Sequence, residues 1–142
     1  MDRNYFNLQM YLDGHRVTIS GISKGAGMIR PNMATMLAAI TTDAHLTPED
    51  AQAILKEAVD KSFNCISVDG HTSTNDTVIL LANGAANEAP LSGEDLVRFA
   101  AEIEKTLIKL AKQIPDDGEG ATHLIDIVVK GASSVPDAKQ IA

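Results

Sequence analysis

The chain has 142 residues, of which 44% are hydrophobic and 22% are charged, values typical of one globular domain of ordinary size. Its 19 acidic and 12 basic residues give a net charge of −7, which argues against a nucleic-acid or anionic membrane partner. The sequence shows a polar N-terminal stretch, a single cysteine and no apolar run of about 18 residues. These features argue against a signal peptide, an internal disulfide and a membrane span, and they predict a cytoplasmic location.

The first segments of the chain predict a β-hairpin followed by a buried strand. Apolar and polar residues alternate from Leu8 to Leu12 and again from Val17 to Ile19. Asp13-Gly14 stands between the two runs and favours a tight turn with positive φ. A glycine-rich loop then extends from Gly21 to Pro31. The apolar run from Met36 to Thr41 indicates a buried strand, although periodicity alone leaves a helix open.

Two amphipathic helices are predicted by their capping residues and apolar stripes. Thr47 suits the N-cap position and Pro48 the first helical position, and an apolar stripe follows them. Ser92 suits the N-cap of a second, longer helix, whose apolar stripe extends to Leu110. Pro115 should end that helix, because proline lacks the backbone N–H that a helix interior needs.

The remaining segments complete an α/β pattern. Thr77–Leu81 follows a polar loop and reads as a strand, and Leu124–Val129 predicts a further strand. Ser134 should begin a third, short helix. Strands and helices in this mixed order predict a mixed sheet with packed helices.

Few residues outside the loops suggest chemistry. The four histidines (His15, His45, His71 and His123) do not stand at metal-ligand spacings, so no metal site is predicted. Cys65 reads as a small buried hydrophobic residue rather than a reactive thiol. The glycines around Lys24 and Glu119 lack the order of a phosphate-binding loop, which leaves plain turns or a close approach to a ligand or another chain.

The loop from Lys24 to Leu37 is the strongest candidate for chemistry. Thr35 stands at the junction between this loop and the following strand, and the small residue Ala34 precedes it. This is the layout of an N-terminal nucleophile: the Thr35 hydroxyl attacks the Ala34 carbonyl, and water then hydrolyses the resulting ester. The freed α-amine, with a pKa of about 8, can serve as the base for the same hydroxyl. The alternative is simply that threonine begins many strands because it is β-branched.

Lys24–Leu37 closely resembles the self-cleaving segment of the bifunctional glutamate N-acetyltransferase / ornithine acetyltransferase family of arginine biosynthesis. The match extends from about Gly14 to the end of the chain. Further matching motifs follow in the same order: Ile40–Ala44, Ser67–Gly70, Thr72–Thr77, Leu80–Gly84 and Gly118–Thr122.

The resemblance implies a fold, a reaction and a set of site residues. The fold would be part of an αββα sandwich like that of N-terminal-nucleophile hydrolases, cut into an α-chain-like part (1–34) and a β-chain-like part (35–142). The reaction would move an acetyl group from N-acetylornithine to glutamate through an acetyl-Thr35 ester. Ala34-Thr35 matches the cleavage site, and Lys24, Thr35 and Glu119 match substrate-binding residues. No resident cofactor is implied, although some members use acetyl-CoA.

The sequence also departs from the family pattern. No Thr-Gly step, which supplies the family's oxyanion donors, precedes Thr35. His71 stands where an acid is usual, and His123 stands where a basic residue is usual. We therefore expect a truncated central fragment that is inactive alone and that forms homo-oligomers or associates with the missing parts of the enzyme. A non-catalytic self-associating module and a complementary subunit of a split enzyme remain as alternatives.

Overall fold

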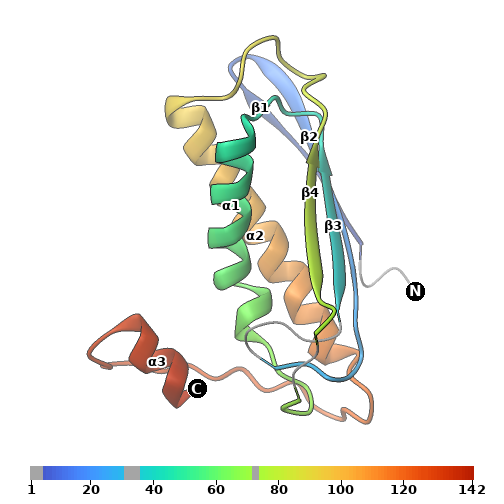
Figure 1. The fold of residues 1–142 in the computed structure, drawn as a ribbon, viewed down its shortest axis with the longest axis vertical. Helices are drawn as coiled ribbons and strands as arrows, with labels where there is room; N and C mark the ends of the chain where they lie inside the picture. The colour runs from blue at the N-terminus through green and yellow to red at the C-terminus, as the bar shows by residue number, and fades with distance from the viewer. Residues whose placement is uncertain (1–4, 31–35, 72–73) are drawn as a thin grey trace.

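A computed structural model describes residues 5–30, 36–71 and 74–142. These residues form one sheet with two long helices on one of its faces, and Figure 1 shows the two layers. The strands are β1 (Tyr5–Leu12), β2 (His15–Lys24), β3 (Leu37–Thr42) and β4 (Thr77–Ala82), and the helices are α1 (Pro48–Asp60), the short 3-10 turn η1 (Phe63–Cys65), α2 (Gly93–Asp116) and α3 (Val135–Ile141). The predicted mixed sheet with packed helices is confirmed.

The described strands lie in the order β1-β2-β3-β4, so neighbours in the sequence are neighbours in the sheet. β1, β2 and β3 pair antiparallel, whereas β3 and β4 pair parallel. Helix α1 makes the crossover that a parallel pair requires. The hairpin turn has φ of 48° at Asp13 and 74° at Gly14, as the twist of a two-residue hairpin demands.

The core lies between the sheet and the two long helices. It contains aliphatic side chains and two phenylalanines; the residues with no exposed surface include Leu12, Val17, Ile19, Ile40, Phe99, Ile103, Leu107, Leu110 and Ile114. Helix α2 passes close to β2, since a Cβ on Gly21 would lie only 2.8 Å from Leu110 Cδ1. The absence of a side chain at Gly21 therefore allows α2 to pack closely against β2.

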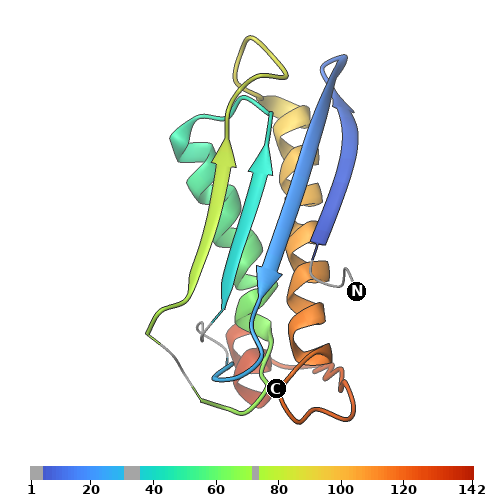
Figure 2. The same ribbon diagram turned by 90° about the vertical axis from the view of Figure 1, so that its right-hand side faces the viewer.

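The other face of the sheet carries no helix in the described residues, and Figure 2 shows this face toward the viewer, with α1 and α2 behind the strands. Its residues alternate with the buried ones. Pairing places Tyr5 beside Ile22, Ile22 beside Ala39 and Ala39 beside Ile79. Tyr5, Ile22 and Ile79 are 54%, 56% and 45% exposed, so this row forms an apolar band across the open face.

The predicted capping of α1 is confirmed, and α2 differs slightly from expectation. The Asp50 amide donates to the Thr47 side chain at 3.1 Å, whereas the Ser92 side chain makes no capping hydrogen bond. Pro115 lies inside the last turn of α2 instead of ending it. The Asp117 amide donates to the carbonyls of Gln113 and Ile114, which closes that turn around the proline.

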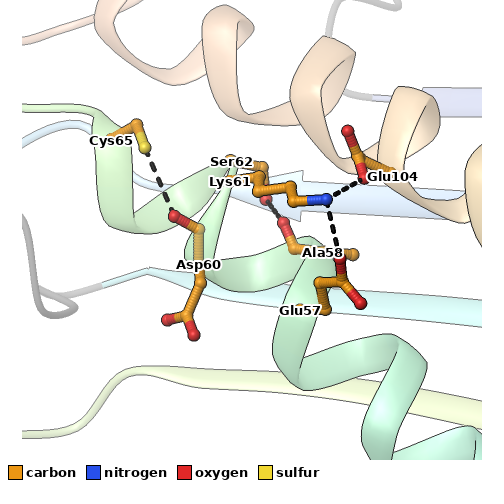
Figure 3. A network of polar contacts seen from close by, with 7 residues as sticks. All are labelled: Glu57, Ala58, Asp60, Lys61, Ser62, Cys65 and Glu104. Atoms are coloured by element: carbon orange, nitrogen blue, oxygen red, sulfur yellow. Dashed lines mark hydrogen bonds and ion pairs between the residues drawn. The ribbon is translucent and has the colours of Figure 1, made fainter. Parts of the chain in front are cut away.

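A polar network ties the end of α1 to the middle of α2 (Figure 3). Lys61 Nζ lies 2.7 Å from Glu57 Oε1 and 2.8 Å from Glu104 Oε2. These hydrogen bonds, first that with Glu104, raise the pKa of Lys61. Cys65 is exposed beside this network, so the prediction that it is buried is wrong. In η1, Phe63 takes the buried position and turns Cys65 outward.

The C-terminal segment is the third departure from expectation. Leu124–Val129 belongs to no strand and pairs with no described part of the sheet, and Ile125 and Val128 are 77% and 73% exposed. A strand needs a partner for its backbone groups, and in the described residues none is offered here. The third helix is confirmed: the Asp137 amide donates to Ser134 Oγ at 3.2 Å.

Candidate functional site

The two proposed site residues that the structure describes, Lys24 and Glu119, lie at one end of the sheet. Lys24 is the last residue of β2, and pairing places it beside Leu37, which in turn pairs with Thr77. β2 therefore ends where β3 and β4 begin, at the lower end of the sheet in Figure 2. Lys24 is exposed and alternates with buried Ser23, so it lies on the open face. The segments next to this end contain the motifs that resemble the acetyltransferase family, among them Ser67–Gly70 and Gly118–Thr122.

The loop after α2 brings Glu119 against the loop after β2. The Glu119 amide donates to the Ala26 carbonyl at 2.8 Å. A Cβ on Gly27 would lie 3.5 Å from Glu119 Oε2 and 3.6 Å from Asp69 Oδ2, so two carboxylates approach the same point of the backbone. Glu119 thus lies in a loop that contacts the loop following Lys24, although the two residues are 95 positions apart in the sequence. The negative potential of the two carboxylates favours a cationic group near Gly27.

Ala34 and Thr35 lie outside the described residues, so their predicted roles stay predictions. Met36, the next residue along the chain, is buried at 2% exposure. Its amide donates to Asp76 Oδ1 at 2.6 Å, and its carbonyl accepts from the Thr77 amide at 3.1 Å. The backbone that follows Thr35 is therefore held by the start of β4.

Asp69 holds the loop that follows β2, on the N-terminal side of the predicted cleavage site. Its carboxylate accepts hydrogen bonds from the amides of Met28 at 2.7 Å, Ile29 at 3.1 Å and His71 at 3.0 Å. These backbone hydrogen bonds, led by that from His71, lower the pKa of Asp69. In the sequence, Asp69 and Asp76 stand out only as parts of the motifs Ser67–Gly70 and Thr72–Thr77. The signal that could have identified them is the ability of an aspartate in a polar loop to accept backbone amides.

The glycines of this end serve turns and close packing within the chain. Gly120 has a φ of 76°, in the left-handed region that glycine favours. A Cβ on Gly118 would lie 3.0 Å from Val68 Cγ1 and 3.1 Å from the Pro115 carbonyl, so this position also needs glycine. Of the readings left open, a turn fits Gly120 and close backbone approach fits Gly118.

The opposite end of the sheet holds a cavity of about 640 Å³ between the hairpin turn and the start of α2. Asp13, His15, Glu88 and Asp95 supply its charged and titratable lining, and neither Lys24 nor Glu119 lies in it. The described ranges contain no cluster of three or more His, Cys, Asp or Glu side chains arranged to hold a metal ion. Within the same ranges, no helix combines the length and apolar character needed to cross a bilayer.

The fold defines an α/β domain of the N-terminal-nucleophile class, and comparisons with known proteins agree. The model of the ArgJ family matches residues 3–142. The arginine biosynthesis bifunctional protein ArgJ of Listeria monocytogenes serotype 4b is 52% identical over 139 residues, which are 96% of this chain and 35% of that protein. The protein of the same name from Geobacter sulfurreducens is 54% identical over 127 residues, 88% of this chain and 32% of that protein.

The crystal structure of arginine biosynthesis bifunctional protein argJ from Bacillus halodurans is similar in fold. It superposes with a TM-score of 0.54 at 40% sequence identity, over 58% of this chain and 39% of that chain. The chain belongs to the ArgJ family. It spans about a third of the length of the curated relatives that it matches.

Proposed function

We propose that this chain is the central part of an ornithine/glutamate N-acetyltransferase, which moves an acetyl group from N-acetylornithine to glutamate in the cytoplasm. One observation carries the proposal: the Glu119 amide donates to the Ala26 carbonyl at 2.8 Å. This contact joins the Glu119 loop to the Lys24 loop, beside the strand that begins just after Thr35. The similarity to arginine biosynthesis bifunctional proteins supports a role in the same pathway.

Thr35 carries out both half-reactions in this proposal. Its hydroxyl oxygen attacks the acetyl carbonyl of N-acetylornithine, the C–N bond breaks, and ornithine leaves with the proton on its amine. The acetyl group remains on Thr35 as an ester. The amine of glutamate then attacks this ester, so that N-acetylglutamate leaves and the Thr35 hydroxyl is restored.

Cleavage between Ala34 and Thr35 prepares the nucleophile. The Thr35 hydroxyl attacks the Ala34 carbonyl, an ester replaces the peptide bond, and water hydrolyses the ester. The products are residues 1–34 and 35–142, and the new α-amine of Thr35 accepts the proton from the neighbouring hydroxyl. The reaction needs no resident cofactor, and acetyl-CoA is an alternative acetyl donor.

Lys24 and Glu119 bind the substrate in this proposal. The Lys24 ammonium is a compact charge that suits a substrate carboxylate. The Glu119 carboxylate suits the free amine of ornithine, and the nearby Asp69 carboxylate adds to the negative potential there. Because both side chains are exposed at the same end of the sheet, one small zwitterionic molecule can reach them from the solvent.

The isolated chain is inactive in this proposal. No Thr-Gly step precedes Thr35, and loss of an oxyanion-hole donor typically costs about 3 kcal/mol of transition-state stabilisation. Denaturing mass spectrometry tests this directly, and one species near 15.1 kDa is expected. Two species, residues 1–34 and 35–142, would contradict it. Joining the chain to the flanking segments of the Listeria monocytogenes relative should restore cleavage and acetyl transfer, with N-acetylornithine and glutamate as the assay substrates.

A second function rests on the open face of the sheet. The apolar band of Tyr5, Ile22 and Ile79 supports a non-catalytic module that self-associates, or a subunit completed by another chain. Light scattering at micromolar concentration should then show an oligomer, and Ile22→Lys should shift it towards the monomer. Gln9→Lys, on the same face but outside the band, is the matched control. A compact monomer of the unmodified chain would contradict self-association.

A further inference from the structure

Loop Ser67–Thr77 holds the backbone ahead of the predicted cleavage site. The Asp69 carboxylate accepts from the amides of Met28 and Ile29 at 2.7 and 3.1 Å. The Val68 amide donates to the Ile29 carbonyl at 2.8 Å, so both backbone groups of Ile29 are engaged by this loop. The Ile29 side chain is 2% exposed, which anchors the same point in the core.

The same loop holds the backbone behind the predicted cleavage site. The Met36 amide donates to Asp76 Oδ1 at 2.6 Å, and the Met36 carbonyl accepts from the Thr77 amide. Met36 is also 2% exposed, so it has a buried anchor as Ile29 does. The Met36 nitrogen is bonded to the carbonyl carbon of Thr35. The Asp76 carboxylate therefore acts one peptide unit away from the proposed nucleophile.

The position of Asp76 follows from the sheet. Thr77 begins β4 and pairs with Leu37, the first residue of β3. Asp76 thus directly precedes β4, and its carboxylate accepts from the amide of Met36, which directly precedes the neighbouring strand β3. A carboxylate that accepts an amide hydrogen makes a charge-assisted bond, about twice as strong as a neutral one. Groups placed by rigid strands hold their geometry better than groups on loops.

We propose that Asp76 is a positioning residue for Thr35, and that Asp69 fixes the opposite flank of the same segment. The proposal rests on the acetyl-transfer function proposed above. Two carboxylates of one loop would set the separation of Ile29 and Met36, and so the ends between which the reacting residue lies. Asp76 touches neither substrate nor reacting atom, and it acts through the Met36 amide.

The first test uses acetyl transfer by the chain joined to the flanking segments of the Listeria monocytogenes relative. Asp76→Ala should lower kcat about 10- to 100-fold, the typical effect of misplacing a reacting group, and leave KM for N-acetylornithine within about twofold. Asp76→Asn keeps an oxygen acceptor for the Met36 amide and should recover most of this loss. Asp95→Ala removes a partly exposed carboxylate paired with Arg98 at the other end of the sheet and is the matched control.

The second test uses amide hydrogen exchange in the 142-residue chain and does not depend on activity. Asp76→Ala should speed exchange of the Met36 amide at least about tenfold, because its acceptor is lost. The Met28 and Ile29 amides should keep their rates in this variant and lose protection in Asp69→Ala. Val17, in the buried part of β2, reports whether each variant is folded.

The outcomes separate this inference from the function on which it rests. If the unmodified joined protein neither cleaves nor transfers acetyl groups, the proposed function fails. The exchange experiment alone then tests whether Asp69 and Asp76 hold the two flanks of the segment. If that protein is active and folded Asp76→Ala keeps its kcat, the positioning role is overturned. Unchanged Met36 exchange in folded Asp76→Ala overturns it as well. An equal loss in Asp76→Asn and Asp76→Ala would contradict the acceptor role of the side-chain oxygen.

Discussion

At the hairpin end of the sheet, local turns and caps combine with contacts between distant residues: the Leu91 amide donates to the His45 carbonyl at 2.9 Å, and Arg98 donates to the Tyr11 carbonyl at 3.2 Å. The turn at Asp13-Gly14 and the cap of α1 by Thr47 each involve only a few consecutive residues. At the Lys24 end, three loops far apart in the sequence hold one another, through Asp69, Asp76 and the Glu119 amide. Both ends rest on the same core.

The placement of the site residues separates stability from chemistry. Neither Lys24 nor Glu119 lies at the hairpin end, so changes there should alter the free energy of unfolding and little else. The Lys24 end is held by contacts between residues 40 to 93 positions apart, and it carries Lys24 and Glu119. Changes there should alter the reaction more than the stability. The four predictions below test that separation, in order of decreasing effect.

Thr35→Ala should abolish both cleavage and acetyl transfer in the chain joined to its relative's flanking segments. Loss of a nucleophile typically lowers the rate about 10³-fold or more. Thr35→Ser keeps a hydroxyl and should retain some of both activities. Mass spectrometry reports cleavage, and a steady-state assay reports transfer. Unmodified rates in Thr35→Ala would remove Thr35 from the mechanism.

Phe99→Ala should lower the free energy of unfolding by about 3–5 kcal/mol, because it leaves a cavity between α2 and the sheet. Phe99 has no exposed surface. Since both ends of the sheet rest on this core, both should lose protection from exchange together. Val97→Ala, on the same helix and 67% exposed, should change stability by less than about 0.5 kcal/mol. Urea unfolding measures both variants, and equal effects would show that α2 does not pack as described.

Thr47→Ala should cost about 1 kcal/mol, because the Asp50 amide loses its capping acceptor. Ser92→Ala is a matched control at the N-cap of α2, where the side chain makes no capping hydrogen bond, and it should cost clearly less. Thermal unfolding of the two variants gives the comparison. Acetyl transfer by the joined protein should be unaffected by either, and a fall in kcat for Thr47→Ala would contradict the separation of the two ends.

The pH dependence of the Asp69 contacts should be the smallest effect. Backbone hydrogen bonds lower the pKa of Asp69 below its ordinary value of 3.8. A lowered pKa in the folded state means that these contacts contribute fully above about pH 3.8 and are lost as the pH falls through the lower folded value. Asp69 should therefore stay ionised between pH 5 and 7, and the protection that it gives to the Met28 and Ile29 amides should not change within this range. An Asp69 titration midpoint above 3.8, measured by NMR, would contradict the hydrogen-bond geometry.

Local sequence chemistry predicted the regular elements well. Asp13-Gly14 specified the hairpin, and Thr47 with Pro48 specified the start of α1, because turns and caps depend on residues within four positions of each other. The alternation along β2 predicted which face is buried. The motif around Thr35 led to the correct family, since unusual residues in a fixed order carry information that periodicity lacks.

Contacts across the sequence decided the rest. Leu124–Val129 has the composition of a strand, yet no described strand pairs with it, because pairing depends on a partner edge. Cys65 is exposed because the packing of Phe63 in η1 decides which side chain of that turn is buried.

The sequence by itself determined the family, the hairpin, the caps and the apolar stripes, all of which depend on nearby residues or on a motif. Only the tertiary structure decided that Asp69 and Asp76 hold both flanks of the segment with Thr35, and that the Glu119 loop meets the Lys24 loop. The physical reason is that a carboxylate accepts any amide within about 3 Å, and which amide comes that close depends on the path of the whole chain.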